Sequence, residues 1–102
     1  MIQLVVLSRA ESELQRIYNR LEDFQSGRGQ EFLRRLDLAF AHLQQFPEIG
    51  PVYFKTYRRL LLGQFPFGLF YSVEGNRLII ITAASLQQDP ASIRAILDDP
   101  AR

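Results

Sequence analysis

The sequence contains no cysteine, and it has a single histidine, His42, and a single lysine, Lys55. The lack of cysteine excludes a disulfide framework, a thiolate metal site and a cysteine nucleophile, and it suits a reducing cytoplasm. No HxH, HExxH or carboxylate cluster indicates a metal site, so we expect neither a metal ion nor another cofactor. His42 lies off the apolar stripe of its predicted helix, and we interpret it as a surface residue.

The chain also lacks a long apolar run and a strong excess of charge. No apolar stretch approaches the roughly 18 residues that a membrane span needs, and no signal segment opens the chain. We therefore expect a soluble, cytoplasmic protein with no membrane partner. The net charge of +1 is a poor match to a protein that neutralises many phosphates. A length of 102 residues predicts one domain, residues 1–102.

Three consecutive segments rich in branched and aromatic residues predict antiparallel strands, at 57–62, 67–73 and 77–83. Gly75 and Asn76 suit a two-residue turn, which would place Glu74 opposite Arg77, Tyr71 opposite Ile80 and Phe70 opposite Ile81. Alternation along these strands makes both faces of the sheet apolar. Each face therefore needs a cover, one from the chain's own helices and the other from the C-terminal helix or a partner.

The remaining segments predict an α+β fold in the order β-α-α-β-β-β-α, an antiparallel-rich sheet packed by an antiparallel helix hairpin. Residues 2–7 form a strand, and Ser8 with Glu11 matches a capping box. Apolar stripes predict two helices separated by residues 25–29, the second ending at Pro47. Residues 48–56 are expected to form a loop, Asp89 and Pro90 to start a short helix, and residues 98–102 to fray. The apolar positions of the two long helices are Ala10, Leu14, Ile17, Leu21 and Phe24, then Phe32, Leu36, Ala39 or Phe40, Leu43 and Phe46.

Several segments, in order and spacing, resemble the RelE/ParE superfamily of toxins, in its ParE-like or plasmid-stabilisation branch. They are AESELQRIY (10–18), EFLRRL (31–36), QFPEIG (45–50), YRRLLLGQFPFGLFYSVEGNRLIII (57–81) and the Asp89-Pro90 step. The resemblance implies the same fold, a cytoplasmic location and a cognate antitoxin protein. Members that cleave messenger RNA use basic residues on the central strands, which Lys55, Arg58 and Arg59 match. Where such relatives carry His-x-Arg-Arg-x-Pro, this chain has Ser85 to Pro90, including the uncharged Gln87 and Gln88.

Arg58 and Arg59 are adjacent on a strand, so they point to opposite faces. One is a candidate for contact with a target or an acidic antitoxin, and the other for pairing with a helix carboxylate. Lys55 lies between Tyr53 and Tyr57. This group either holds a nucleotide by aromatic stacking and positive charge, or packs locally. The second apolar face, through Phe70, Ile79 and Ile81, is either core beneath the C-terminal helix or partly a groove for the antitoxin. The candidate binding residues are Tyr53, Lys55, Tyr57, Arg58, Arg59, Phe70, Ile79, Ile81, Gln87 and Gln88.

The leading functional hypothesis is a toxin of a type II toxin–antitoxin system that acts by binding a protein. The resemblance suggests DNA gyrase as this target. One alternative is a ribosome-dependent endoribonuclease that cuts messenger RNA with Lys55, Arg58 and Arg59. General acid-base cleavage needs a proton-transfer group and converging cations, and Gln87 and Gln88 supply neither, which disfavours an enzyme. The other alternative is a non-toxic family member that retains only partner binding.

Overall fold

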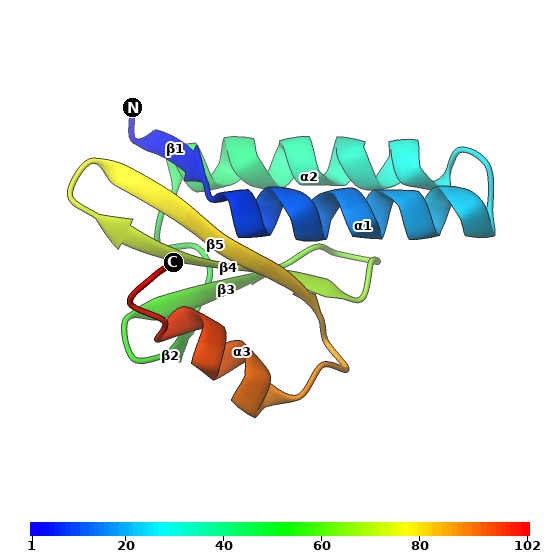
Figure 1. Cartoon of the computed structure of the whole chain (residues 1–102). Helices are drawn as coiled ribbons and strands as arrows, with labels where there is room; N and C mark the ends of the chain where they lie inside the picture. The colour runs from blue at the N-terminus through cyan, green and yellow to red at the C-terminus, as the bar shows by residue number, and fades with distance from the viewer.

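A computed structural model describes all 102 residues, which form three helices and a five-stranded sheet (Figure 1). The elements are β1 (Gln3–Val6), α1 (Ser8–Phe24), α2 (Arg28–Gln45), β2 (Val52–Phe54), β3 (Tyr57–Leu61), β4 (Phe67–Glu74), β5 (Arg77–Ser85) and α3 (Pro90–Leu97). The predicted α+β class and element order are confirmed, with one addition. The predicted loop at 48–56 contains β2, because a turn with a positive φ of 54° at Lys55 folds three branched or aromatic residues back onto β3. No helix combines the length and apolar character that crossing a membrane requires.

The strands lie in the order β1-β5-β4-β3-β2, with β1 parallel to β5 and every other pair antiparallel. The Gly75-Asn76 turn sets the predicted register near the hairpin end, where Glu74 pairs with Arg77 and Tyr71 with Ile80. The predicted pairing of Phe70 with Ile81 is wrong, because a β-bulge shifts the register and Phe70 faces Thr82 instead. The extra residue, Ile81, still points to the same face as Phe70 and packs with it.

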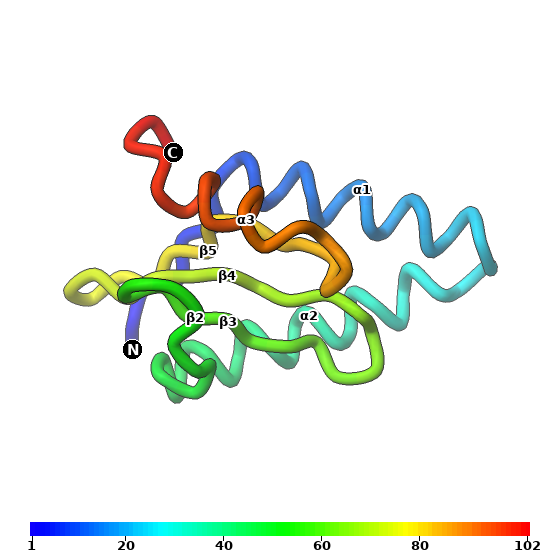
Figure 2. The backbone as a smooth tube through the Cα atoms, turned by 90° about the horizontal axis from the view of Figure 1, so that it is seen from below, coloured from blue at the N-terminus to red at the C-terminus, as the bar shows by residue number.

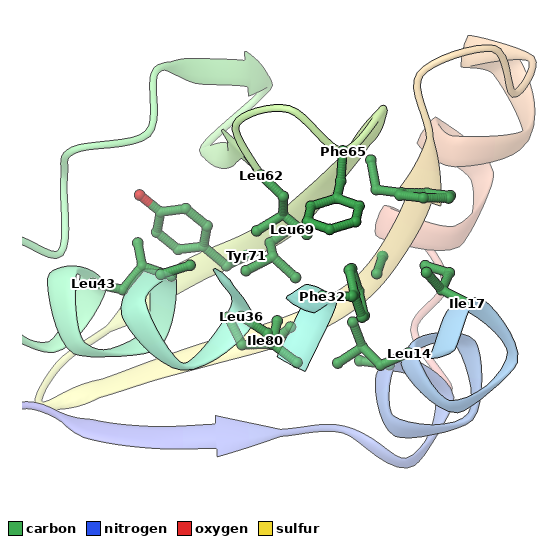
Figure 3. Packing of buried hydrophobic residues seen from close by; sticks show 14 of the residues in the cluster. Leu14, Ile17, Phe32, Leu36, Leu43, Leu62, Phe65, Leu69, Tyr71 and Ile80 are labelled. Atoms are coloured by element: carbon green, nitrogen blue, oxygen red, sulfur yellow. The ribbon is translucent and has the colours of Figure 1, made fainter. Parts of the chain in front are cut away.

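The helix hairpin α1–α2 covers one face of the sheet (Figure 1). Its apolar stripes meet side chains of β4 and β5, and Figure 3 shows Phe32 of α2 between Leu14 and Phe65. Phe32 contacts the Phe65 ring edge-on at a centroid distance of 5.5 Å. The predicted stripes are buried except at their ends, where Phe24 is 83% and Phe46 54% exposed.

The starts of the two long helices differ from the prediction, and α2 begins at Arg28, inside the predicted break at residues 25–29. The capping box at Ser8 and Glu11 is wrong, because α1 begins directly after β1, with Leu7 at its N-cap and no capping side chain. Helix α2 is capped from its neighbour, since the Glu22 carboxylate of α1 accepts hydrogen bonds from the backbone N–H groups of Gly27 and Gly29. These bonds place a negative charge at the positive end of the α2 dipole.

Helix α3 covers the opposite face of the sheet (Figure 2). Asp89 accepts a hydrogen bond from the Ala91 N–H, and Pro90 is the first helical residue, as predicted. A second apolar cluster lies beneath this helix and consists of Phe70, Ile79, Ile81, Ala84, Ile93 and Leu97. Residues 98–102 follow α3 as exposed turns, in which Asp98 pairs with Lys55 and the Arg102 guanidinium reaches Glu74 at 3.5 Å. The expected fraying of this segment stays a prediction.

Replacing Gly29 with alanine should destabilise the fold, although the same change normally stabilises a helix interior by about 0.5–1 kcal/mol. A Cβ at this position would lie 2.7 Å from a Tyr18 ring carbon and 2.9 Å from the capping Glu22 oxygen. We expect a net loss of about 1 kcal/mol or more in the free energy of unfolding, measured by urea denaturation. The control is Gln30→Ala on the exposed side of α2, and a higher midpoint for Gly29→Ala would contradict the close contact.

Candidate functional site

The predicted binding residues divide between the two faces of the sheet. Arg58 lies opposite Tyr71 of β4, on the face covered by the helix hairpin. Arg59 lies opposite Phe70, on the face covered by α3. The sheet register therefore places the two arginines on opposite faces, as predicted. It also shows that Arg58 is on the helix-hairpin side and Arg59 on the α3 side.

Arg58 and Tyr71 together hold the loop that follows α2. The Arg58 guanidinium donates to the backbone carbonyls of Glu48 at 3.1 Å and Gly50 at 2.9 Å. The Tyr71 hydroxyl donates to the Pro47 carbonyl at 2.7 Å and accepts from the Gly50 N–H at 3.0 Å. Because the Arg58 donors are engaged with backbone, this arginine anchors the loop; no helix carboxylate pairs with either arginine.

Burial raises the pKa of the Tyr71 hydroxyl above its ordinary value of 10.0. The Gly50 hydrogen bond and the Arg58 charge oppose this shift, and Glu48 adds to it. Figure 3 shows the Tyr71 ring beside Leu43 and Leu69. The hydroxyl is therefore a neutral structural donor over the physiological pH range.

Arg59 is held against aromatic rings on the α3 side. Its guanidinium carbon lies 5.0 Å from the centroid of the Tyr53 ring, which contacts Phe70 edge-on, also at 5.0 Å. Gly68 makes this arrangement possible, because a Cβ there would lie 3.1 Å from the Arg59 Cγ. Arg59 has no carboxylate within ion-pair distance, so its charge remains available to a ligand.

Further cations and rings continue this surface toward the C-terminus. The Lys55 ammonium lies 3.0 Å from both Asp98 carboxylate oxygens and 5.3 Å from the Phe54 ring centroid. Arg94 lies 5.9 Å from the same ring, and Arg102 lies 5.5 Å from the Tyr57 ring. We call the whole set the aromatic–cation surface, made of Tyr53, Phe54, Tyr57, Lys55, Arg59, Arg94 and Arg102.

The structure does not bring Lys55, Arg58 and Arg59 together. Arg58 lies on the other face of the sheet, and Lys55 is neutralised by Asp98. Gln87 and Gln88 lie in the exposed β5–α3 loop, where their N–H groups donate to Ser85. His42 is exposed near the end of α2, and no group of three His, Asp or Glu side chains is placed to hold a metal ion. The arrangement offers stacking and charge for binding.

The comparisons with known proteins agree with this architecture. A family model described as the ParE toxin of the type II toxin–antitoxin system parDE matches residues 4–88. The chain belongs to the ParE toxin family. Its structure is similar to a chain of a chromosomal ParDE toxin–antitoxin system from P. aeruginosa, with a TM-score of 0.73 and 21% identity over 83% of this chain and 96% of that one. Among curated proteins, no sequence matches this chain.

In this ParE family member, sequence reasoning missed four residues of the site region: Phe54, Arg94, Asp98 and Arg102. Asp98 lies in the segment that was expected to fray, and it pairs with Lys55. The aromatic run around Lys55 was a usable signal for Phe54. No local signal marks the others, because their partners lie 40 or more residues away in the chain.

The buried candidates Phe70, Ile79 and Ile81 form core beneath α3 and are at most 5% exposed. Of the two interpretations of this face, the structure therefore favours the core. Open apolar surface lies elsewhere, in a groove of about 420 Å³ between α1 and α2 that is lined by Leu14, Tyr18, Leu33 and Phe40 among others. We call this the hairpin groove.

Replacing Tyr71 with phenylalanine should lower the free energy of unfolding by about 1–3 kcal/mol, because it leaves the buried Gly50 N–H without its acceptor. Urea denaturation at pH 7 measures the loss. The matched control is Tyr53→Phe, which keeps the ring against Arg59 and removes no hydrogen bond. Equal stability of the two variants would show that the Tyr71 hydroxyl does not hold the loop.

The same variant should change the response to alkali. Above pH 10 the Tyr71 hydroxyl ionises in the unfolded chain, while in the folded chain it stays neutral until the pH reaches its raised pKa. Stability is therefore lost as the pH rises from 10 through that higher value. Denaturation curves between pH 9 and about pH 12 should show a shallower loss in Tyr71→Phe than in Tyr53→Phe. Parallel losses in the two variants would contradict the burial of this hydroxyl.

Proposed function

We propose that this chain is a toxin that arrests growth by binding a protein, and that a cognate antitoxin neutralises it. The match of the ParE toxin family over residues 4–88 carries the proposal. The separation of Arg58 from Arg59, and the pairing of Lys55 with Asp98, support binding over cleavage of RNA. The near-neutral net charge of +1 supports the same choice.

Two surfaces suit an antitoxin. The hairpin groove would take apolar side chains of an amphipathic segment, because it is open and lined mainly by Leu14, Leu33, Phe40 and the Tyr18 ring. Arg59 on the aromatic–cation surface would take an acidic side chain, since its charge is unpaired and its guanidinium lies against the Tyr53 ring. Phe70, Ile79 and Ile81 would become available only if α3 left its place.

The proposed target is DNA gyrase, which the family resemblance suggests. Purified protein should inhibit supercoiling by gyrase at micromolar concentration. Arg59→Ala should weaken this inhibition by about tenfold or more, as loss of a charged contact does at protein interfaces. The matched control is Arg20→Ala, an exposed arginine of α1 that belongs to neither surface. Full supercoiling in the presence of wild-type protein would refute gyrase as the target.

Expression in growing cells tests the broader proposal. Induction of the chain alone should stop growth, and co-expression of the protein from the neighbouring reading frame should restore it. Unimpeded growth without that protein would favour a non-toxic partner-binding module. Growth arrest accompanied by codon-positioned cuts in translation extracts, lost in Arg58→Ala and Arg59→Ala, would favour the ribonuclease alternative instead.

A further inference from the structure

A charged hollow, separate from the hairpin groove, lies between α2 and the loop that joins β3 to β4. Its volume is about 500 Å³, and its lining includes Arg34 and Arg35 of α2 with Gly63, Gln64 and Phe65 of the loop. In Figure 1 this loop lies toward the end of the molecule that carries the α1–α2 connection, away from β2 and the C-terminus. We call it the basic pocket. No residue of the aromatic–cation surface or the hairpin groove lines it.

The basic pocket carries two uncompensated positive charges. The carboxylate in its lining belongs to Glu31, which pairs with Arg28 at 2.9 Å. Arg34 and Arg35 have no carboxylate within ion-pair distance, and neither guanidinium donates a hydrogen bond to the chain. Two guanidinium groups that line one hollow without counter-charges favour an anion with several acceptor oxygens.

The loop is shaped to bring Arg35 against its backbone. Gly63 has a φ of +65°, and a Cβ there would lie 2.7 Å from two nitrogens of the Arg35 guanidinium. Any other residue would therefore push the guanidinium away. Phe65 anchors the loop in the core, because this residue is 2% exposed and its ring contacts Phe32.

The same loop has unused backbone donors. The N–H groups of Leu62, Phe65 and Phe67 bond to carbonyls within the loop or across it. The N–H groups of Gly63 and Gln64 donate to no group in the chain, and both residues line the pocket. Backbone N–H groups beside arginines are a recurring means of binding oxyanions.

We propose that the basic pocket binds the phosphate group of a small phosphate monoester, such as a nucleotide. A phosphate dianion matches the two guanidinium charges, whereas a single carboxylate would leave one of them unpaired. The hollow is larger than a bare phosphate needs and falls within the range of small-ligand sites, about 300–1,000 Å³. A long nucleic acid is disfavoured, because the neighbouring Arg28 is already paired and the protein as a whole carries only +1.

Calorimetric titration of the full chain tests the site, with AMP, inorganic phosphate and acetate as separate probes at constant ionic strength. AMP should bind with a Kd of about 1 mM or tighter, inorganic phosphate more weakly, and acetate more weakly still. The two phosphate probes distinguish an ester site from a free-phosphate site. No heat from either phosphate probe, or acetate binding as tightly as AMP, would overturn the proposal.

Variants locate the binding. Arg34→Gln and Arg35→Gln should each weaken AMP binding by about tenfold, and Arg35→Lys should weaken it several-fold because lysine keeps the charge but loses the fork. Arg20→Gln on α1 is the control and should leave the affinity unchanged. Circular dichroism verifies that each variant is folded. Equal effects of Arg20→Gln and Arg35→Gln, or full affinity in Arg35→Lys, would show diffuse attraction and overturn the site.

A single-stranded oligonucleotide is the last probe. AMP should bind the pocket at least as tightly, per molecule, as a short oligonucleotide does. An oligonucleotide that binds about a hundredfold more tightly than AMP, with a steep salt dependence, would make this a nucleic-acid surface and refute the small-ligand site. These binding measurements do not depend on growth arrest or gyrase inhibition. Failure of the phosphate-site proposal is therefore distinguishable from failure of the proposed toxin activity.

Discussion

The burial of both faces of the β4–β5 hairpin is the constraint on which the rest of the structure depends. Side chains of these two strands contribute to both apolar clusters, Leu69, Tyr71 and Ile80 to one and Phe70 and Ile79 to the other. Such a hairpin needs a cover on each side. The helix hairpin covers one side and α3 the other, so the face that the sequence left open to a partner is covered within the chain. Partner surface is consequently left to the edges and the outer sides of the helices.

Features that repeat along the chain were predictable, and features created by neighbours in space were not. The apolar stripes and the Gly75-Asn76 turn predicted the helices, the strands and the first pairs of the β4–β5 register. The bulge at Ile81 was not predictable, because an extra residue leaves the local composition unchanged. Ser8 with Glu11 fits a capping box by spacing alone, yet Leu7 takes the N-cap position and Ser8 is already the first helical residue.

The candidate sites follow the same rule. Adjacency on a strand predicted that Arg58 and Arg59 point apart, but only the partner strand shows that Arg58 meets Tyr71 and Arg59 meets Phe70. Lys55 and Asp98 are 43 residues apart, so no local pattern links them. In the basic pocket, Arg35 and Gly63 each look ordinary in sequence. Their significance comes from a backbone approach that only a residue without a side chain allows.

The way α3 is held bears on how a partner can act. An eight-residue helix has little stability of its own, so its place depends on tertiary contacts. The ion pairs near its end are partly exposed, and such pairs contribute about 0–1 kcal/mol each. Burial of Ile93 and Leu97 against Phe70 and Ile81 contributes more, about 1.5–3 kcal/mol for each large side chain. A ligand that competes for Lys55 or Arg102 therefore leaves α3 in place and meets a preformed aromatic–cation surface, which favours binding without rearrangement of the toxin.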